Sequence, residues 1–430
     1  MATRIAILIT LFATVSVFLF GCFLSNLSEI CCEIQEAFLS SQWMLLVCLC
    51  FWCCTLIFLT FSLKDWWLIL FLLGALGAFF INFAMVQSAI DAVILLTGIT
   101  FCKGAKLLLK SGNISNAEAK ITINQIELQE SKVQSSDTRK FLIGLIALMT
   151  ISAFWHLEAA NRFYPGTRWT GLWDNPNIYG MLMGAGLTIA IGFIVDDFIF
   201  KVKNAKLLWF LYPAVGVMVA GLFFSYSRGA WVATAVGLLY LAKAHGKLKL
   251  HWAILGGGVG VAVVIIFWHS TADNGSWYLK RLDLSRPSVQ HRLTAWRGAL
   301  QMMWDHPLGV GWNEAVNICD KNYSPVNDSA AALATNSYLI LGTELGIPAL
   351  LCFVAYVGLC LRGKGRMQNE EFRIQTACRA GAIVLLVAFW FDGGLFNLPT
   401  ATVFWVLLEL GAVRGGKVDS CELMVDCPKT

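Results

Sequence analysis

The stretch Phe223-Phe224-Ser225-Tyr226-Ser227-Arg228-Gly229-Ala230-Trp231 sets a single arginine between two apolar runs, at 207–224 and 230–244. Runs of this kind predict helices that cross a membrane. A cation within such a segment is costly unless it faces a wet cavity or an anion, so an intramembrane arginine usually has a function. Arg228 therefore predicts both a membrane fold and a place where that fold meets an anion.

The composition extends this prediction to the whole chain. Of its 430 residues, 57% are hydrophobic and only 14% are charged, which indicates an all-α polytopic membrane protein. About twelve transmembrane helices are expected. The apolar runs of spanning length lie at 4–24, 41–62, 66–86, 88–109, 140–157, 177–195, 207–224, 230–244, 249–269, 334–360, 375–392 and 397–413.

Basic residues between the runs predict the orientation. Lysine-rich loops such as 103–110 and 201–206 fall on one side if both termini are cytoplasmic, as the positive-inside rule requires. The first run, which follows Arg4, is interpreted as an uncleaved span. The predicted regions are N-terminal transmembrane helices at 1–110, a mobile cytoplasmic linker at 111–139, central transmembrane helices at 140–269, a large outer loop at 270–333, and C-terminal transmembrane helices with a tail at 334–430.

Cysteine and histidine residues do not suggest a metal site. None of the 14 Cys or 6 His residues stands at a metal-ligand spacing, and cysteines in apolar runs are expected to pack as small hydrophobes. We expect neither a metal nor a cofactor. The net charge of +5 reflects cytoplasmic loops, so the expected partner is a lipid bilayer and not nucleic acid.

The outer side departs from this charge bias through a cluster of arginines. Arginine binds phosphate through two parallel hydrogen bonds and keeps its charge when partly desolvated, which favours an anion site. The alternative is that these side chains grip lipid headgroups or pair with Glu158, Asp174, Asp283 and Asp305. The outer basic residues are Arg162, Arg168, Arg228, Lys280, Arg281, Arg286, Arg292 and Arg297.

Within the loop 270–333, the sequence predicts one amphipathic helix. Pro287 and Ser288 mark its start, and Asp305-His306-Pro307 ends it. Apolar residues recur between them at helical spacing, while His291, Arg292 and Arg297 are expected on the opposite face. We expect this helix to lie on the outer membrane surface as a lid over a cavity.

Four stretches together resemble the O-antigen ligase and polymerase superfamily of polytopic glycosyltransferases, which has a GT-C type membrane fold. Each alone is a weak signal, but all four occur in the family's order on one predicted side. They are Gly171-Leu172-Trp173-Asp174-Asn175-Pro176-Asn177-Ile178-Tyr179-Gly180; Ser225-Tyr226-Ser227-Arg228-Gly229-Ala230; Arg292 through Trp296 to His306-Pro307-Leu308-Gly309-Val310-Gly311; and Thr335-Asn336-Ser337-Tyr338-Leu339 with Glu344-Leu345-Gly346.

The resemblance implies transfer of a glycan from undecaprenyl diphosphate to an acceptor sugar hydroxyl, at the periplasmic face of the bacterial inner membrane. Without a metal, arginines must stabilise the diphosphate leaving group, and the expected catalytic residues are Arg162, Arg168, Arg228 and Arg292. The implied partners are the lipid-linked glycan, an acceptor glycan or lipid, and a chain-length regulator. The expected substrate-binding residues are Ser225, Ser227, Asn177, Tyr179, Thr335, Asn336, Tyr338, Arg297 and His306.

Several of these residues also have a purely structural interpretation. Asn177 fits a helix cap, and Ser225 and Ser227 fit hydrogen bonds to a broken backbone beside Arg228. Gly342 and Gly346 stand at the spacing of close helix packing, and Gly309 with Gly311 is typical of a tight turn.

One departure from the family bears on the reaction. The superfamily's ligases have a histidine where this chain has Thr335, and threonine is not a base near neutral pH. The departure favours polymerisation of repeat units over ligation, with Glu158, His306, Glu314 and Asp320 as candidate bases. A transporter or flippase of a lipid-linked anion is the alternative of another class, although the chain shows no internal repeat of the kind common in transporters.

Overall fold

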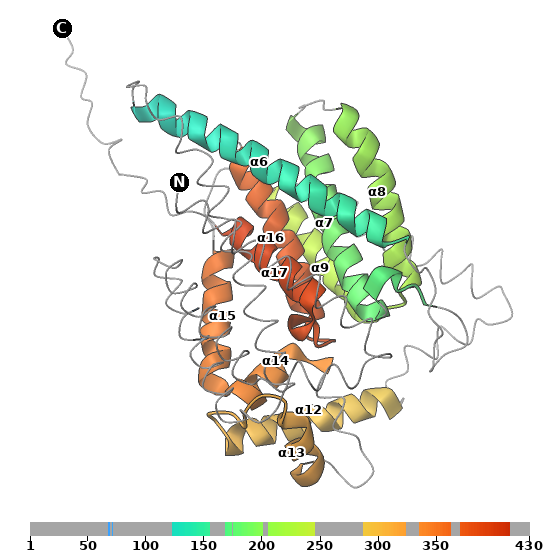
Figure 1. Cartoon of the computed structure of the whole chain (residues 1–430), viewed down its shortest axis with the longest axis vertical. Coiled ribbons are helices and arrows are strands. Elements are labelled where there is room, and N and C mark those ends of the chain that lie inside the picture. Colours follow the sequence, from blue (N-terminus) through green and yellow to red (C-terminus); the bar gives the residue numbers. More distant parts are fainter. Residues whose placement is uncertain are drawn as a thin grey trace, which may run out of the picture.

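The computed structural model describes residues 68, 71, 123–154, 168–173, 175–200, 205–245, 287–323, 335–362 and 370–412. These residues form helices and their connections, so the all-α prediction is confirmed for this part of the chain (Figure 1). The helices are α6 (Ile123–Ser152), η2 (Gly171–Trp173), α7 (Pro176–Phe200), α8 (Ala205–Phe224), α9 (Arg228–Ala244), α12 (Pro287–Asp305), α13 (Ala315–Asn322), α14 (Ser337–Ile340), η4 (Leu341–Leu345), α15 (Ile347–Leu361), α16 (Glu370–Ala388), η5 (Gly394–Phe396) and α17 (Leu398–Gly411).

Helices α7, α9 and α16 form the centre of the bundle, and each packs against the other two. Small residues bring them close together. A Cβ at Gly184 of α7 would meet the side chain of Thr234 in α9, and one at Gly237 of α9 would meet Val384 of α16. Helices α8 and α17 pack on the outside of this centre, against α7 and α16 respectively. The close contacts hold together the three helices whose ends carry the candidate site.

Two of the described helical segments, Pro176–Asp197 and Leu207–Phe224, are long and apolar enough to cross a membrane. They coincide with the predicted spans 177–195 and 207–224. The predicted spans 4–24, 41–62, 66–86, 88–109 and 249–269 lie outside the described residues, apart from Leu68 and Phe71. The total of about twelve spans therefore stays a prediction.

Two predicted segments differ from the structure. Helix α6 begins at Ile123, so the second half of the predicted linker 111–139 is helical. The predicted span 334–360 is broken into α14, η4 and α15, because Gly346 adopts a φ of 90° and Pro348 follows it.

The broken segment is held by the third sequence motif. The N–H groups of Val310 and Gly311 donate to the carbonyls of Thr343 and Glu344, at 2.9 and 3.1 Å. Gly309, with a φ of 89°, lies so close to Gly346 that a Cβ on either glycine would overlap the other turn. Helix α12, which ends just before this turn as predicted, lies across one end of the bundle with α13 against it (Figure 1).

Candidate functional site

The candidate site lies at the bundle end where α7 and α9 begin and where α8 and α16 end, which we call the site end. Arg168 joins these elements. Its Nε donates to the Ser225 carbonyl at 2.7 Å, and its Nη2 donates to Asn177 Oδ1 at 3.0 Å. The N–H of Trp169 donates to Phe224 O at 3.0 Å. The segment before α7 is thereby fastened to the junction between α8 and α9.

That junction is a sharp turn with an unusual backbone. Tyr226 adopts a φ of 51°, a region that residues other than glycine rarely occupy and that is enriched at functional sites. Ser225 Oγ donates to Leu222 O and accepts from the N–H of Ser227, so its hydroxyl is engaged in the turn. Hydrogen bonding within the turn is one of the two roles that the sequence suggested for Ser225. The other role, contact with phosphate, stays a prediction.

Arg228 is the first residue of α9 and is exposed at the site end. The positive end of a helix dipole disfavours a cation, so an arginine here is not explained by helix stability. The side chain of Ser227, at the N-cap, makes no capping hydrogen bond. The first N–H groups of a helix have no partner within it and, together with the Arg228 guanidinium, are suited to bind an anion.

The turn after α16, residues 389–396, contacts all four motifs, and the first of them reaches it through the hydrogen bond from Asn177 to Asp392. A Cβ on Gly229 would meet the side chain of Phe391, which places the start of α9 against this turn. Arg292 Nη1 of α12 donates to Phe391 O at 3.4 Å. Ser337 of the fourth motif donates from its N–H to Phe389 O and from its Oγ to Asp392 O.

Aromatic rings make the same connection between α12, α14 and the turn. Trp390 lies 5.8 Å from Trp296 of α12 and 5.7 Å from Tyr338 of α14, between ring centroids. The Tyr338 hydroxyl donates to Leu386 O at 2.6 Å. Because these contacts are specific to the side chains present, they hold α12 and its Arg292 at the site end.

Asp392 is a candidate site residue that the sequence analysis did not single out. Burial raises the pKa of its carboxyl above the ordinary value of 3.8, while hydrogen bonds from Asn177 and from the Gly393 N–H, and the charges of Arg292 and Arg168, act against this rise. It is the one acidic residue between Glu371 and Glu409. That isolation could have identified it, but Asp392-Gly393-Gly394 is also an ordinary turn sequence.

The two polar atoms of the Asn336 side chain, in the fourth motif, differ in their hydrogen bonding. Its Oδ1 caps α14 by accepting from the N–H groups of Tyr338 and Leu339, at 3.0 and 3.2 Å. Its Nδ2, on a fully buried side chain, has no hydrogen-bond partner among the described residues. Thr335 precedes it and is half-buried. The substrate contacts expected for Asn336, Thr335 and Tyr338 stay predictions.

Helix α12 differs from the predicted division into faces. Ala295, Ala299 and Met302 are buried, and Trp296 packs inward with them. Arg297 shares the exposed side with Leu293 and with Trp304, which is 84% exposed, because small residues and not the large apolar ones let α12 approach its neighbours. His306 is also exposed, and its backbone forms the turn that ends the helix.

Of the remaining predicted residues, Tyr179 is fully buried. Its ring lies against Gly171 and Gly221, which favours a packing role, and its contact with a sugar stays a prediction. Arg162 and the candidate base Glu158 lie outside the described residues. Glu314 accepts from Asn317 Nδ2 at 3.5 Å just before α13, and Asp320 is exposed on that helix.

The arrangement brings Arg168, Asn177, Arg292 and Asp392 together and sets Arg228 beside the same turn. It offers cationic donors for an anion and one carboxylate for a proton. Within the described ranges, no group of three or more His, Cys, Asp or Glu side chains is placed to hold a metal ion. These features suit transfer chemistry on an anionic substrate at the end of a helical bundle.

Comparison with known proteins relates part of the chain to a described family. Residues 213–354, about a third of the chain, match the family described as O-antigen ligase, and this match confirms the resemblance to the O-antigen ligase and polymerase superfamily. No curated protein matches the chain. The matched region includes Arg228, Arg292 and Asn336, whereas Arg168, Asn177 and Asp392 lie outside it.

Proposed function

We propose that this protein is an inverting, metal-independent glycosyltransferase that polymerises repeat units of O-antigen or exopolysaccharide. It would take the glycan from undecaprenyl diphosphate and pass it to an acceptor sugar hydroxyl at the periplasmic face of the inner membrane. The family match supports the class of substrate and the membrane location. A GT-C type arrangement with about twelve spans belongs to the same proposal.

The observation that carries this proposal is the connected network from Arg168 through Asn177 to Asp392, with Arg292 on its far side. Arg168 is engaged with Ser225 and Asn177, so we assign it to positioning and to the local positive potential. Arg228, exposed at the start of α9, is the stronger candidate to bind the diphosphate. Arg292 reaches the same turn from α12 and would close the site over the lipid-linked substrate.

The reaction assigns one task to each end of the network. The acceptor hydroxyl oxygen attacks the anomeric carbon while the bond from that carbon to the phosphate oxygen breaks. The diphosphate leaves with the electron pair, and Arg228 with the α9 N-terminus stabilises its growing charge. The hydroxyl proton passes to the Asp392 carboxylate, whose raised pKa makes it a better proton acceptor than an ordinary aspartate.

Thr335 favours polymerisation over ligation onto lipid A core or a protein. The ligases of this superfamily have a histidine base at this position, and threonine cannot act as a base in its place. The deciding experiment uses purified protein and lipid-linked repeat units. We expect chains of increasing length on the carrier, and transfer of one unit to a lipid or protein acceptor without elongation would instead identify a ligase.

Thr335→Ala is expected to slow elongation only mildly, because leaving-group stabilisation contributes more than this hydroxyl. Arg292→Ala and Arg168→Ala are expected to slow it by about tenfold or more, since each removes a cation from the site. Initial rate and chain-length distribution are measured for each variant, with a chelator present throughout. The mechanism is wrong if Thr335→Ala abolishes transfer while both arginine variants are silent, or if the chelator stops the reaction.

The proposed orientation predicts opposite labelling at the two ends of the bundle. Leu308 is exposed at the site end, and Lys243 is exposed in the last turn of α9. In spheroplasts, a membrane-impermeant thiol reagent should modify Leu308→Cys but should reach Lys243→Cys only after the membrane is opened. The reverse pattern would place the site in the cytoplasm.

A further inference from the structure

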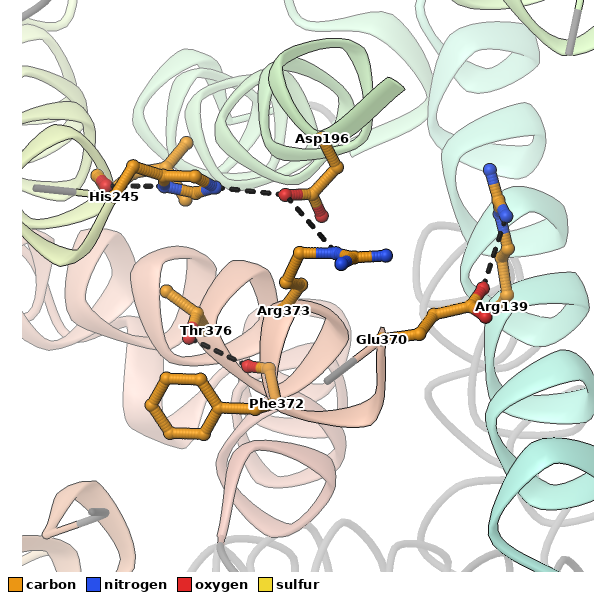
Figure 2. Close-up of polar contacts among 8 residues, drawn as sticks. Arg139, Asp196, His245, Glu370, Phe372, Arg373 and Thr376 are labelled. Atoms are coloured by element: carbon orange, nitrogen blue, oxygen red, sulfur yellow. Dashed lines mark hydrogen bonds and ion pairs between the residues drawn. The ribbon is translucent and has the colours of Figure 1, made fainter. Parts of the chain in front are cut away.

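A second polar cluster lies at the end of the bundle opposite the candidate site, and the proposed reaction does not use it (Figure 2). Asp196 Oδ1, near the end of α7, lies 2.9 Å from His245 Nε2, at the end of α9. Arg373 Nε, near the start of α16, lies 3.8 Å from the same oxygen, at ion-pair distance. One carboxylate oxygen therefore connects the three central helices, and Arg139 of α6 pairs beside it with Glu370 of α16 at 3.2 Å.

This cluster is almost fully buried, so its geometry has energetic consequences. The side chain of His245 is 2% exposed and that of Asp196 is 12% exposed. Burial alone would lower the pKa of His245, but the hydrogen bonds to Asp196 and to the Leu241 carbonyl outweigh it and raise the pKa above 6.5. The raised pKa favours a charged imidazole paired with Asp196. Removing one member of a buried ion pair destabilises the fold, while replacing all members by apolar residues is often neutral.

The packing between α7 and α9 does not by itself specify how the two helices are aligned along their axes. Gly180, Gly184, Thr188 and Gly192 follow one another every four residues on α7, so they form a single stripe. Ideal Cβ atoms at Gly180 and Gly184 would lie 3.1 Å from Ala230 Cβ and 3.4 Å from Thr234 Cβ. If α7 slid along α9 by one turn, about 5.4 Å, each small residue of the stripe would take the position of the next one.

Asp196 stands four residues after Gly192 and is the next position of the same stripe. Among the described residues, its carboxylate lies at hydrogen-bond distance from His245 and at ion-pair distance from Arg373, and a slide of one turn would break both contacts. A single buried polar group can fix the register of packed helices in this way at some cost in stability.

Each of the three helices carries a candidate site residue at its other end. Asn177 is at the start of α7, Arg228 is at the start of α9, and Asp392 follows α16. Asp196 and Asn177 are separated by about 29 Å at 1.5 Å per helical residue. A slide of α7 by one turn would thus separate Asn177 from both Arg168 and Asp392.

We propose that Asp196, His245 and Arg373 form a register lock that aligns α7, α9 and α16 and thereby positions the distant site. These three are positioning residues. The alignment itself is independent of the reaction, whereas its effect on transfer rests on the proposed function.

Disulfide trapping of paired cysteines reads the register directly. Gly184→Cys with Thr234→Cys should crosslink in the native alignment, since their Cβ separation is close to the disulfide optimum. Gly184→Cys with Ala230→Cys should crosslink only after a slide of one turn. Linked peptides are identified by mass spectrometry, so the native cysteines stay in place.

The decisive experiment introduces the cysteine pairs into a triple variant, Asp196→Leu, His245→Leu and Arg373→Met, in which apolar residues replace the whole cluster. We expect its melting temperature to stay close to the wild-type value, while the ratio of 184/230 to 184/234 crosslinks rises about tenfold or more. A folded triple variant that still crosslinks only 184 with 234 overturns the register lock.

Single variants at His245 decide the same question if the triple variant does not fold. His245→Gln keeps a donor towards Asp196 and should keep the native crosslink, whereas His245→Leu should raise the 184/230 ratio. Asp197→Asn is the matched control, because this neighbouring buried carboxylate lies off the stripe and should leave the ratio unchanged. Equal ratios for the Gln and Leu variants would contradict the proposal.

Transfer assays on the same variants separate the two inferences. We expect the triple variant to lose transfer by about tenfold or more, with little change in KM, because misaligned groups affect the reacting geometry. A shifted crosslink with unchanged transfer would refute the positioning of the site. If the wild-type protein shows no transfer at all, the proposed function fails, and the crosslinks still test the lock.

Discussion

Replacement of Arg228 by lysine is expected to slow transfer by roughly thirty-fold to a thousand-fold, which corresponds to about 2–4 kcal/mol of transition-state stabilisation. Lysine keeps the charge but loses the planar fork that binds two phosphate oxygens at once. Arg228 is exposed at the N-terminus of α9, where its charge opposes the helix dipole. Arg228→Ala should therefore leave the melting temperature unchanged or slightly raised while transfer is lost.

The matched control for Arg228 is Lys243→Ala, which removes an exposed cation from the last turn of the same helix. That lysine lies at the favourable end of the dipole, so its loss should slightly lower stability and leave transfer unchanged. Initial rates with purified lipid-linked substrate and thermal unfolding are measured side by side. Near wild-type turnover of Arg228→Ala would remove this residue from the mechanism.

Asp392→Asn is the second change expected to have a large effect, with a loss of transfer on the order of a hundred-fold or more. Asparagine keeps the shape but can no longer accept the proton. In the wild-type protein the reactive carboxylate forms only above its raised pKa, so the rate should fall on the acid side at a pH above the ordinary aspartate value of 3.8. That acid limb should disappear in the residual activity of the variant.

Stability distinguishes this role of Asp392 from a merely structural one. A carboxyl whose folded-state pKa is raised binds its proton more tightly in the native protein than in the unfolded chain. The ionised group therefore opposes folding above the raised pKa, and this cost disappears as the pH falls through it. Asp392→Asn should keep or raise the melting temperature at neutral pH.

The control for Asp392 is Asp305→Asn, an exposed carboxylate that accepts from the Tyr323 hydroxyl at 2.8 Å. It should leave transfer and its pH profile unchanged. A strong loss of both stability and transfer in Asp392→Asn, with the acid limb retained, would assign Asp392 to holding the turn and not to proton transfer.

The helices that depend on local signals were predictable from the sequence. Helix α8 follows its apolar run, and α12 begins and ends where Pro287 and Asp305-His306-Pro307 indicate. The break at Gly346 was missed because the apolar run continues past Gly346 and Pro348, and the contact of Gly346 with the turn at 309 joins parts far apart in the sequence. The polar first half of α6 was missed since hydropathy detects apolar helices alone.

The candidate site was predictable only in part, for a similar reason. A lone arginine in an apolar setting identified Arg228, and the order of the motifs identified Arg292 and Asn336. Asp392 was missed because Asn177 and the two arginines that act on it are distant in the sequence and come near it only in the fold. Arg297 was assigned to the wrong face, because small residues such as Ala299 determine which side of α12 packs.

The turn 389–396 has a consequence for how relatives of this chain can be recombined. It lies outside the region 213–354 that matches the O-antigen ligase family, yet Ser337, Arg292 and Gly229 within that region all contact it. The matched region is therefore smaller than the set of residues that form the proposed site. A chimera that exchanges 213–354 alone would join foreign motifs to the resident Asp392 turn, whereas a chimera that exchanges 168–412 would carry that turn together with the residues that contact it.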